Sequence, residues 1–420
     1  MKTREFRKAP AILAAAGLAL VLVLTGCLTG GDGRPVLTHD DGIPPTVMTV
    51  STGLTHTVAI KTDGSLWTWG QNLYGRTGIG VGGGNMITPL QIGRDNDWAY
   101  VAAGAAHTVA IGRDGSLWAW GSNSHGQLGD GTIVNRWAPT RIGTDTNWAY
   151  ITAGLGYTVA IRTDGTLWAW GNNEYGQLGI GETAGTTPNR LTPTQIGTDT
   201  NWAYVAAGIR HHTAAIRTDG SLWAWGRKDR YSGWPPVIHQ VIQDYGNAPV
   251  QIGTDTNWAY VAVGGSYIMA IQTDGSLWAW GRNCMGQLGI GEAGAATYRL
   301  TPTRVGTGAN WVSVAAGGSH TLAIQTDGSL WAWGANWSGQ LGVGGATGPS
   351  INWDDSYGYE VLLTPTRIGV DADWASVVVG GSHTLATRTD GTLWAWGGNW
   401  FGHLGDGTTT DRNSPVSVIP

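Results

Sequence analysis

Short runs in which hydrophobic residues alternate with small or polar ones recur along most of the chain, and turn residues separate them. In residues 56–70, the run His-Thr-Val-Ala-Ile-Lys is followed by Thr-Asp-Gly-Ser and then by Leu-Trp-Thr-Trp-Gly. Alternation with a period of two predicts β-strands, and an Asp-Gly dipeptide between two such runs predicts a β-hairpin. We therefore expect a hairpin here, with a two-residue type I′ turn at Asp63 and Gly64.

The hairpin predicted around this turn would have two unlike faces. A two-residue turn sets Ile60 opposite Trp67 on a bulky face. The other face would carry small residues, such as Ala110 opposite Ala119 in the next copy of the pattern. Sheets that stack side by side need complementary surfaces. We expect the indole face of one sheet to fill the space that the alanine face of its neighbour leaves.

The hairpin pattern occurs seven times along the chain. The segment Asp-Gly-Ser/Thr-Leu-Trp-x-Trp-Gly recurs at intervals of 50 to 63 residues, beginning at Asp63, Asp114, Asp164, Asp219, Asp274, Asp327 and Asp390. A further strand precedes each hairpin, and a fourth follows it after a loop. Units of this length with four short strands are typical of propeller blades. We therefore predict an all-β fold, a seven-bladed β-propeller of four-stranded blades over residues 46–420. Whether one blade combines both ends of the chain is left open.

Four repeated segments carry a family resemblance: Trp-x-x-Val-x-x-Gly, His-Thr-Val-Ala-Ile, Asp-Gly-Ser-Leu-Trp-Ala-Trp-Gly and Asn-x-x-Gly-Gln-Leu-Gly. They resemble the repeats of the regulator of chromosome condensation (RCC1) family, and the resemblance implies a seven-bladed propeller. Within that family, the eukaryotic founder is a nucleotide exchange factor for a small GTPase and binds chromatin. A bacterial secreted relative of the β-lactamase inhibitory protein type clamps an enzyme with one propeller face. The resemblance therefore implies the fold and leaves the activity open.

The N-terminal segment differs from everything after it. Four basic residues lie within the first eight positions, and an apolar run of 14 residues, 11–24, follows them. That run is shorter than the roughly 20 residues of a membrane-spanning helix and is typical of a signal peptide. Leu24-Thr25-Gly26-Cys27 resembles the lipobox of bacterial lipoproteins, which implies lipid attachment at Cys27. A plain secretory signal with an incidental cysteine is the alternative.

From this segment we predict how the protein is processed and where in the cell it is located. Residues 1–26 would be a lipoprotein signal peptide, and residues 27–45, rich in Gly, Asp and Pro, would hold the lipidated cysteine and a flexible tether. The acylated Cys27 would anchor the protein in a lipid bilayer, since acyl chains contribute about 0.8 kcal/mol per buried methylene. The expected location is extracytoplasmic, in a bacterial cell envelope.

Charge and residue types argue against several classes of function. The net charge is −5, so nucleic acid is not an expected partner. Histidine recurs at one repeat position in five units, but Tyr157 and Tyr267 stand there in the other two. Tyrosine can replace a hydrogen-bonding histidine but not a metal-binding nitrogen. We therefore expect structural side chains there, and no metal ion or other cofactor. No catalytic motif stands out, so we predict that the protein is not an enzyme. We expect Cys284 to be a small packed side chain and not a reactive thiol.

Aromatic residues in the connections that follow the Trp-x-Trp-Gly strands are the candidates for a binding site. Loops carry side chains to the surface, and exposed tryptophan and tyrosine often dominate binding energy. The connections of units four and six also depart from the repeat. The candidate binding residues are Arg227, Tyr231, Trp234, Trp337, Trp353, Asp354, Asp355, Tyr357, Tyr359, Trp400 and Phe401. Some of these rings could instead cover the blade edges.

Together these features predict an envelope-tethered module that binds a protein partner, as a scaffold or an inhibitor, through loops on one propeller face. A carbohydrate-binding propeller is the first alternative, because exposed indole rings also stack on sugars. A glycan-processing enzyme would need converging acids, for which Asp354, Asp355 and Glu360 are the candidates. Activity as a guanine-nucleotide exchange factor is disfavoured, because the export signal would remove the chain from cytosolic nucleotide.

Overall fold

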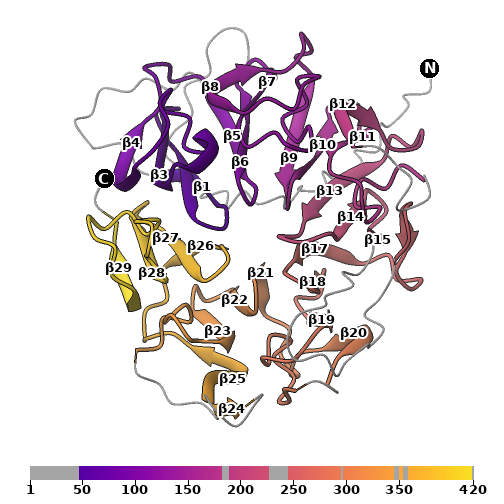
Figure 1. The fold of residues 1–420 in the computed structure, drawn as a ribbon. Helices are drawn as coiled ribbons and strands as arrows, with labels where there is room; N and C mark the ends of the chain where they lie inside the picture. The colour runs from indigo at the N-terminus through magenta and orange to yellow at the C-terminus, as the bar shows by residue number, and fades with distance from the viewer. Residues whose placement is uncertain are drawn as a thin grey trace, which may run out of the picture.

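Seven antiparallel β-sheets form a closed ring in the computed structural model (Figure 1). The structure describes residues 47–181, 189–226, 245–294, 297–344, 350–352 and 358–418. Within these ranges the regular elements are strands, apart from one short 3-10 helix, η1 (Leu73–Gly75). The prediction of an all-β, seven-bladed propeller is confirmed. Within the same ranges, no helix has the length and apolar character needed to cross a membrane.

Each blade is built from consecutive strands, with the first strand at the centre of the ring and the last at its outer edge. The first strands line the centre: β1 (Val47–Thr52), β5 (Trp98–Ala103), β9 (Trp148–Ala153), β13 (Trp202–Ala207), β17 (Trp258–Val263), β21 (Trp311–Ala316) and β26 (Trp374–Val379). The second strands are β2 (His56–Lys61), β6 (His107–Gly112), β10 (Tyr157–Arg162), β14 (Thr213–Arg217), β18 (Tyr267–Gln272), β22 (His320–Gln325) and β27 (His383–Arg388).

The remaining strands complete the hairpin and the outer edge of each blade. The third strands are β3 (Leu66–Gln71), β7 (Leu117–Gly121), β11 (Leu167–Gly171), β15 (Leu222–Trp225), β19 (Leu277–Gly281), β23 (Leu330–Ala335) and β28 (Leu393–Gly397). The fourth strands are β4 (Asn85–Gln91), β8 (Arg136–Arg141), β12 (Arg190–Gln195), β16 (Val250–Gln251), β20 (Arg299–Arg304), β25 (Gly358–Arg367) and β29 (Arg412–Ser417). Blade 6 has a fifth strand, β24 (Ser350–Asn352), paired with β25.

Every blade comes from one continuous stretch of chain, which settles the question of a composite blade. The sheet orders run β1-β2-β3-β4 through β26-β27-β28-β29 without exchange of strands. The ring closes where β26 and β27 of blade 7 contact β1 of blade 1. Sequence repeats and blades therefore coincide.

The hairpin turn differs from the expected two-residue turn. The amide of Lys61 donates to the carbonyl of Ser65 at 3.0 Å, and Gly64, with φ of 83°, donates to the carbonyl of Lys61 at 2.9 Å. Among the described residues, Tyr74 alone combines a side chain with a positive φ, so Asp63 does not adopt the type I′ conformation. The loop thus has three residues, with glycine in the left-handed position. The predicted type I′ turn is wrong.

The longer turn shifts the strand register by one residue and changes both faces. Ala59 pairs with Trp67, and Val58 pairs with Thr68, so the predicted pairing of Ile60 with Trp67 is wrong. The tryptophans share their face with small residues of the second strand. The opposite face carries valine, isoleucine and leucine.

Neighbouring blades pack an aliphatic face against a tryptophan face. Val109, Ile111 and Leu117 of blade 2 cluster with Ala160 and Trp170 of blade 3. The indole rings therefore fill the space beside the neighbouring blade, as expected, but the receiving surface is branched aliphatic and not lined mainly by alanine. The same arrangement closes the ring, where Leu385 and Leu393 cluster with Trp69. Shape complementarity of this kind gives protein interiors their density.

In five of the seven blades, a buried tryptophan also hydrogen-bonds to the connection between the third and fourth strands of the preceding blade. The indole Nε1 of Trp120 donates to the Arg76 carbonyl at 3.1 Å, across the junction of blades 1 and 2. The Nε1 of Trp69 donates to the His403 carbonyl at 3.0 Å, across the junction of blades 7 and 1. A hydrogen bond made in a dry interior fixes geometry as well as adding stability.

A belt of buried polar side chains links the blades near the centre. The Nε2 atoms of His56 and His107 lie 3.0 Å from the Thr108 and Thr158 hydroxyls of the next blade. In blade 3, the Tyr157 hydroxyl replaces histidine and donates to the His212 carbonyl at 2.6 Å. The prediction of a structural hydrogen-bonding side chain is confirmed at His56, His107 and Tyr157, whereas His383 in blade 7 is buried with neither ring nitrogen hydrogen-bonded. Burial lowers the pKa of His107 to about 3.

Candidate binding surface

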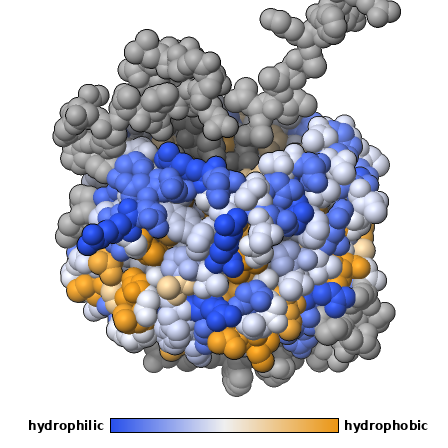
Figure 2. All heavy atoms as spheres, turned by 90° about the horizontal axis from the view of Figure 1, so that it is seen from above, coloured by the Kyte–Doolittle hydropathy of each residue, from blue (hydrophilic) through white to orange (hydrophobic). Residues whose placement is uncertain are grey.

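The ring has two faces with different side chains. The loop face carries the connections between first and second strands and between third and fourth strands. The turn face carries the Asp-Gly turns and the connections between blades. Among the described residues, exposed large hydrophobic side chains gather on loops of the loop face in blades 1 and 2: Leu73, Tyr74, Val81, Ile133 and Val134. Figure 2, a view onto the edge of the ring, shows orange patches in its lower half and the largest blue area in its upper half.

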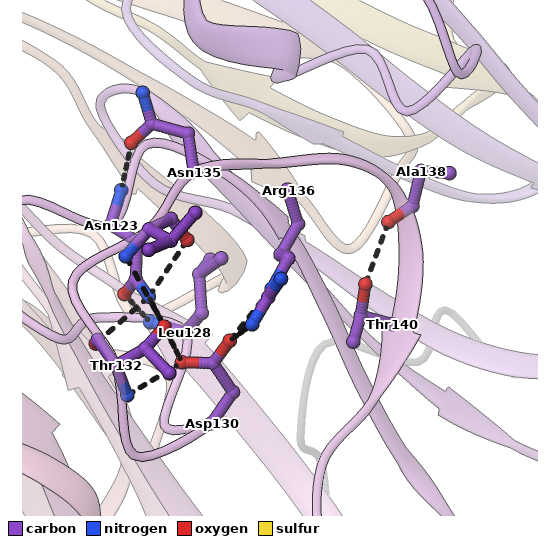
Figure 3. Close-up of polar contacts among 9 residues, drawn as sticks. Asn123, Leu128, Asp130, Thr132, Asn135, Arg136, Ala138 and Thr140 are labelled. Carbon is purple, nitrogen blue, oxygen red and sulfur yellow. Dashed lines mark hydrogen bonds and ion pairs between the residues drawn. The ribbon is translucent and has the colours of Figure 1, made fainter.

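In blades 2 and 7, the loop between the third and fourth strands is held by a buried asparagine of its own. In blade 2, the Asn123 Oδ1 accepts from the Leu128 amide at 3.0 Å (Figure 3). Its Nδ2 donates to Asp130 Oδ1 at 3.0 Å and to the Val134 carbonyl at 3.1 Å. Asn399 makes the corresponding contacts in blade 7. The Asn of the repeated Asn-x-x-Gly segment therefore ties both ends of its loop together.

An ion pair between a buried aspartate and a partly exposed arginine supports the same loop. Asp130 Oδ2 lies 2.6 Å from Arg136 Nη2, and the Asp130 side chain is 7% exposed. Burial opposes ionisation of Asp130, but hydrogen bonds from Thr132, Arg136 and Asn123 outweigh it and lower the pKa. The carboxylate is therefore charged at neutral pH and serves the loop fold.

The variable residues of Asn-x-x-Gly present their side chains to solvent in blades 1, 6 and 7. Trp400 is 72% exposed, Trp337 is 45% exposed and Leu73 is 49% exposed. Phe401 is partly buried, and its ring centroid lies 6.4 Å from that of His403. Blades 6, 7 and 1 are consecutive, so Trp337, Trp400 and Leu73 lie on one arc of the loop face. We call these three residues the exposed arc.

Sequence reasoning found two members of the exposed arc and missed the third. Leu73 was not among the candidates because only aromatic side chains were considered in the Asn-x-x-Gly segments, and this segment carries leucine at that position. Its place directly after Asn72, in the slot that Trp337 and Trp400 occupy, was the available signal.

Most of the other candidates lie outside the described residues. Arg227, Tyr231 and Trp234 fall within 227–244, and Trp353, Asp354, Asp355 and Tyr357 fall within 353–357. The lipidation candidate Cys27 falls within 1–46, which also lies outside. For Tyr359 only the backbone is described, and it pairs with Ile351 between β24 and β25. Whether the loops of units four and six form one site stays a prediction.

The described part of the loop face exposes apolar and aromatic side chains. No group of three or more His, Cys, Asp or Glu among them is arranged to hold a metal ion. Cys284 is buried and free, as predicted for a small packed side chain. What the loop face offers is exposed apolar and aromatic area on loops with fixed backbones.

Comparison with known families decides the assignment. The model for the regulator of chromosome condensation (RCC1) repeat matches residues 63–111, 114–161, 164–216, 274–324, 327–387 and 390–420. The chain belongs to this family. A second model of the RCC1 repeat matches residues 49–76, 98–127, 148–177, 311–340 and 374–402.

Two curated relatives illustrate the range of RCC1-repeat proteins. The Ultraviolet-B receptor UVR8 of Arabidopsis thaliana is 30% identical over 393 residues, which cover 89% of this chain and 70% of the receptor. The human E3 ubiquitin-protein ligase HERC2 is 27% identical over 387 residues, but the chain spans only 6% of its length. RCC1-repeat proteins are mostly regulators or binding proteins, which indicates an interaction or regulatory role here.

Solved structures agree with the fold. Yeast RCC1 (Prp20), in a crystal structure with Kap60, superposes with a TM-score of 0.73 at 20% identity, covering 100% of this chain and 90% of that one. Human WBSCR16 superposes with a TM-score of 0.69 at 20% identity, covering 85% of this chain and 94% of that one. At such identities the likeness concerns the propeller fold alone.

Proposed function

We propose that this RCC1-repeat propeller is a protein-binding module, tethered to a bacterial cell envelope by lipid on Cys27, that contacts its partner through the loop face. The single observation behind the binding surface is the exposed arc: Trp400, Trp337 and Leu73 are 45–72% exposed on loops that buried asparagines hold. Fixed loops lose little conformational entropy on binding, so a modest apolar contact suffices.

Relatives support a protein as the partner. Yeast RCC1 (Prp20) has been crystallised bound to Kap60, and its binding to Gsp1p and histones has been studied. The tether rests on the sequence alone, on the basic, apolar and Leu-Thr-Gly-Cys segments that end at Cys27. A short lipid anchor on a flexible segment would leave the propeller free to turn its loop face toward a partner.

Site-specific photocrosslinking in the native envelope tests the binding face. The full chain carries p-benzoylphenylalanine in place of Trp400, and the matched control carries it in place of Val370, which is 86% exposed on the turn face. We expect a protein adduct from position 400 and none from position 370. Adducts of equal yield at both positions, or adducts with glycan or lipid only, would contradict the proposal.

The tether is tested separately with Cys27→Ser. The wild-type chain should incorporate labelled palmitate and sediment with membranes. The variant should incorporate none and be released. A wild-type chain that stays unlabelled would rule out the lipid anchor while leaving the binding face untouched.

A further inference from the structure

Arginine side chains lie across pairs of tryptophan rings at the turn-face end of three blades. In blade 3, the guanidinium carbon of Arg162 lies 4.4 Å from the ring centroid of Trp148 and 3.9 Å from that of Trp168. Its Nη2 atom lies 2.6 Å from Asp145 Oδ2, in the connection from blade 2. A planar cation is thus held between aromatic faces and a carboxylate, the arrangement that suits guanidinium best.

Blades 4 and 7 repeat this arrangement with their own residues. Arg217 lies 4.5 Å and 4.0 Å from the ring centroids of its two tryptophans and pairs with Asp199. Arg388 lies 4.7 Å and 4.5 Å from its two and pairs with Asp371 at 2.6 Å and Asp373 at 3.4 Å. The protein therefore shows three times how a guanidinium group is bound at this position of a blade.

Blade 2 has the same rings but no arginine. Trp98 and Trp118 meet edge to face at 5.8 Å and 75°, as Trp148 and Trp168 do at 5.9 Å and 77°. In the strand register, Trp98 lies opposite Gly112, whereas Trp148 lies opposite Arg162. Trp98 is accordingly 9% exposed, against 4% for Trp148. With glycine in this place, no arginine side chain lies over the pair, and Trp98 is slightly more exposed than Trp148.

The carboxylates of the arrangement are also present in blade 2. Asp95 precedes Trp98 by three residues, as Asp145 precedes Trp148, and Asp97 adds a second carboxylate in the place of Asp373 of blade 7. Among the ion pairs of the described residues, neither Asp95 nor Asp97 has a basic partner. Arg113 is exposed at the same groove; its backbone amide donates to the Asp97 carbonyl at 2.7 Å, and its side chain is in none of these ion pairs.

A groove opens where the arginine is missing. It has a volume of about 850 Å³ and lies between the outer strands β4 and β8. Its lining includes Trp98, Trp118, Gly112, Arg113, Asp95 and Asp97. The corresponding groove between blades 4 and 5 measures about 460 Å³. There Gln272 stands opposite Trp258, and it is buried. Blade 2 therefore combines a tryptophan pair without an arginine over it, two carboxylates and open space.

We propose that this groove in blade 2 binds the guanidinium group of an arginine side chain that a partner protein brings. The cation would stack on Trp98 and Trp118 and pair with Asp95 and Asp97, in the place that Arg162 fills in blade 3. Lysine would fit less well, because an ammonium group is compact, strongly hydrated and unable to pair with a carboxylate through two parallel bonds. The inference rests on the proposed protein-binding role, and because the groove lies at the turn-face end of blade 2, it adds a contact in that blade outside the loop face.

Short peptides test the groove on the full chain. We would titrate acetyl-Gly-Arg-Gly-amide into the protein and follow the indole N–H resonances of tryptophan by NMR, with lysine and citrulline peptides as controls. Citrulline keeps the shape of arginine without its charge. We expect saturable shifts with the arginine peptide, binding about tenfold weaker with lysine, and none with citrulline.

Two variants place the binding in blade 2. Gly112→Arg supplies the internal arginine of blades 3, 4 and 7 and should abolish peptide binding; its Cβ would approach Asp114 Oδ1 and Ser116 Oγ to 2.8 Å, so these side chains must shift. The exposed double variant Asp95→Asn/Asp97→Asn avoids that strain and should weaken binding about tenfold. Asp145→Asn in blade 3, where Arg162 already fills the site, should leave peptide binding unchanged.

Equal binding of the arginine and citrulline peptides, or unchanged binding in the Asp95→Asn/Asp97→Asn variant, overturns the assignment of the groove. If the peptides fail while position 400 still crosslinks to a protein, the groove assignment falls and the proposed function stands. If the arginine peptide binds but no protein adduct forms, the groove stands and the proposed loop-face function falls.

Discussion

Replacing belt histidines with tyrosine should make the propeller less sensitive to acid. His107 and His320 are fully buried, and burial lowers the pKa of His107 to about 3 and that of His320 to about 4. The protein itself supplies the substitute, because Tyr157 and Tyr267 occupy the same position in blades 3 and 5. The variant His107→Tyr/His320→Tyr should therefore keep the hydrogen-bonded belt while removing two titrating groups.

The sign and size of the effect follow from proton binding. Unfolded histidine has a pKa of about 6.5, so between pH 6.5 and 4 the unfolded chain holds protons that the folded chain does not. Acid therefore favours unfolding, and stability is lost as the pH falls. For a folded pKa at or below about 4, lowering the pH from 7.5 to 5 costs about 2 kcal/mol for each histidine. Over the same pH change, the free energy of unfolding of the double variant should therefore fall by about 4 kcal/mol less than that of the wild type.

Urea unfolding followed by circular dichroism, at pH values between 7.5 and 5, measures this difference. The turn aspartates, such as Asp114 and Asp164, do not contribute to the loss of stability in this range. Hydrogen bonds from Ser116 and Thr166 lower their pKa values, so these carboxylates titrate at lower pH. Equal loss of stability in the wild type and the double variant over this range would refute the reasoning, as would a wild-type stability that does not change with pH.

Three further outcomes are expected. Gly115→Ala should lower the free energy of unfolding by about 2 kcal/mol or more, because φ at Gly115 is 80° and a Cβ would collide with the Thr146 carbonyl oxygen. Gly143→Ala, where φ is 65° and no atom lies near the added Cβ, should lower it by less in the same urea titration. Asn123→Ala should lower the free energy of unfolding by about 1–3 kcal/mol, against under about 0.5 for exposed Ser124→Ala. In a Cys27→Ser background, Cys284 should react with a thiol reagent only after unfolding; rapid reaction of the native protein would contradict its burial.

The sequence predicted the blade count because the blade motif is almost invariant between copies. It did not predict the turn, because an Asp-Gly dipeptide fits a two-residue type I′ turn and also a three-residue loop that ends in left-handed glycine. The choice depends on hydrogen bonds such as that from Ser65 Oγ to Asp63 Oδ1 at 2.6 Å, which favour the longer loop. One extra loop residue then exchanged the partners of every tryptophan.

The candidate site was predictable only in part. Trp337 and Trp400 could be placed on the loop face because their slot follows a recognisable asparagine. The groove of blade 2 was missed because it depends on a side chain that is absent. Gly112 gains significance only when the strand register shows that arginine occupies its place in blades 3, 4 and 7. Aligning the residue two before each turn aspartate would have found it.

The contact that joins blades 7 and 1 is of the same kind as the contact between any two consecutive blades, so the position of the chain ends is not built into the ring. In blades 1 and 2, the six residues 92–97 carry the chain from the outer strand to the next inner strand. A linker of similar length between Ser417 and Val47 should accordingly join the two ends of the propeller. The gene could then be reopened between any two blades, and a circular permutant would present the same loops on the same scaffold with its tether moved to a different blade.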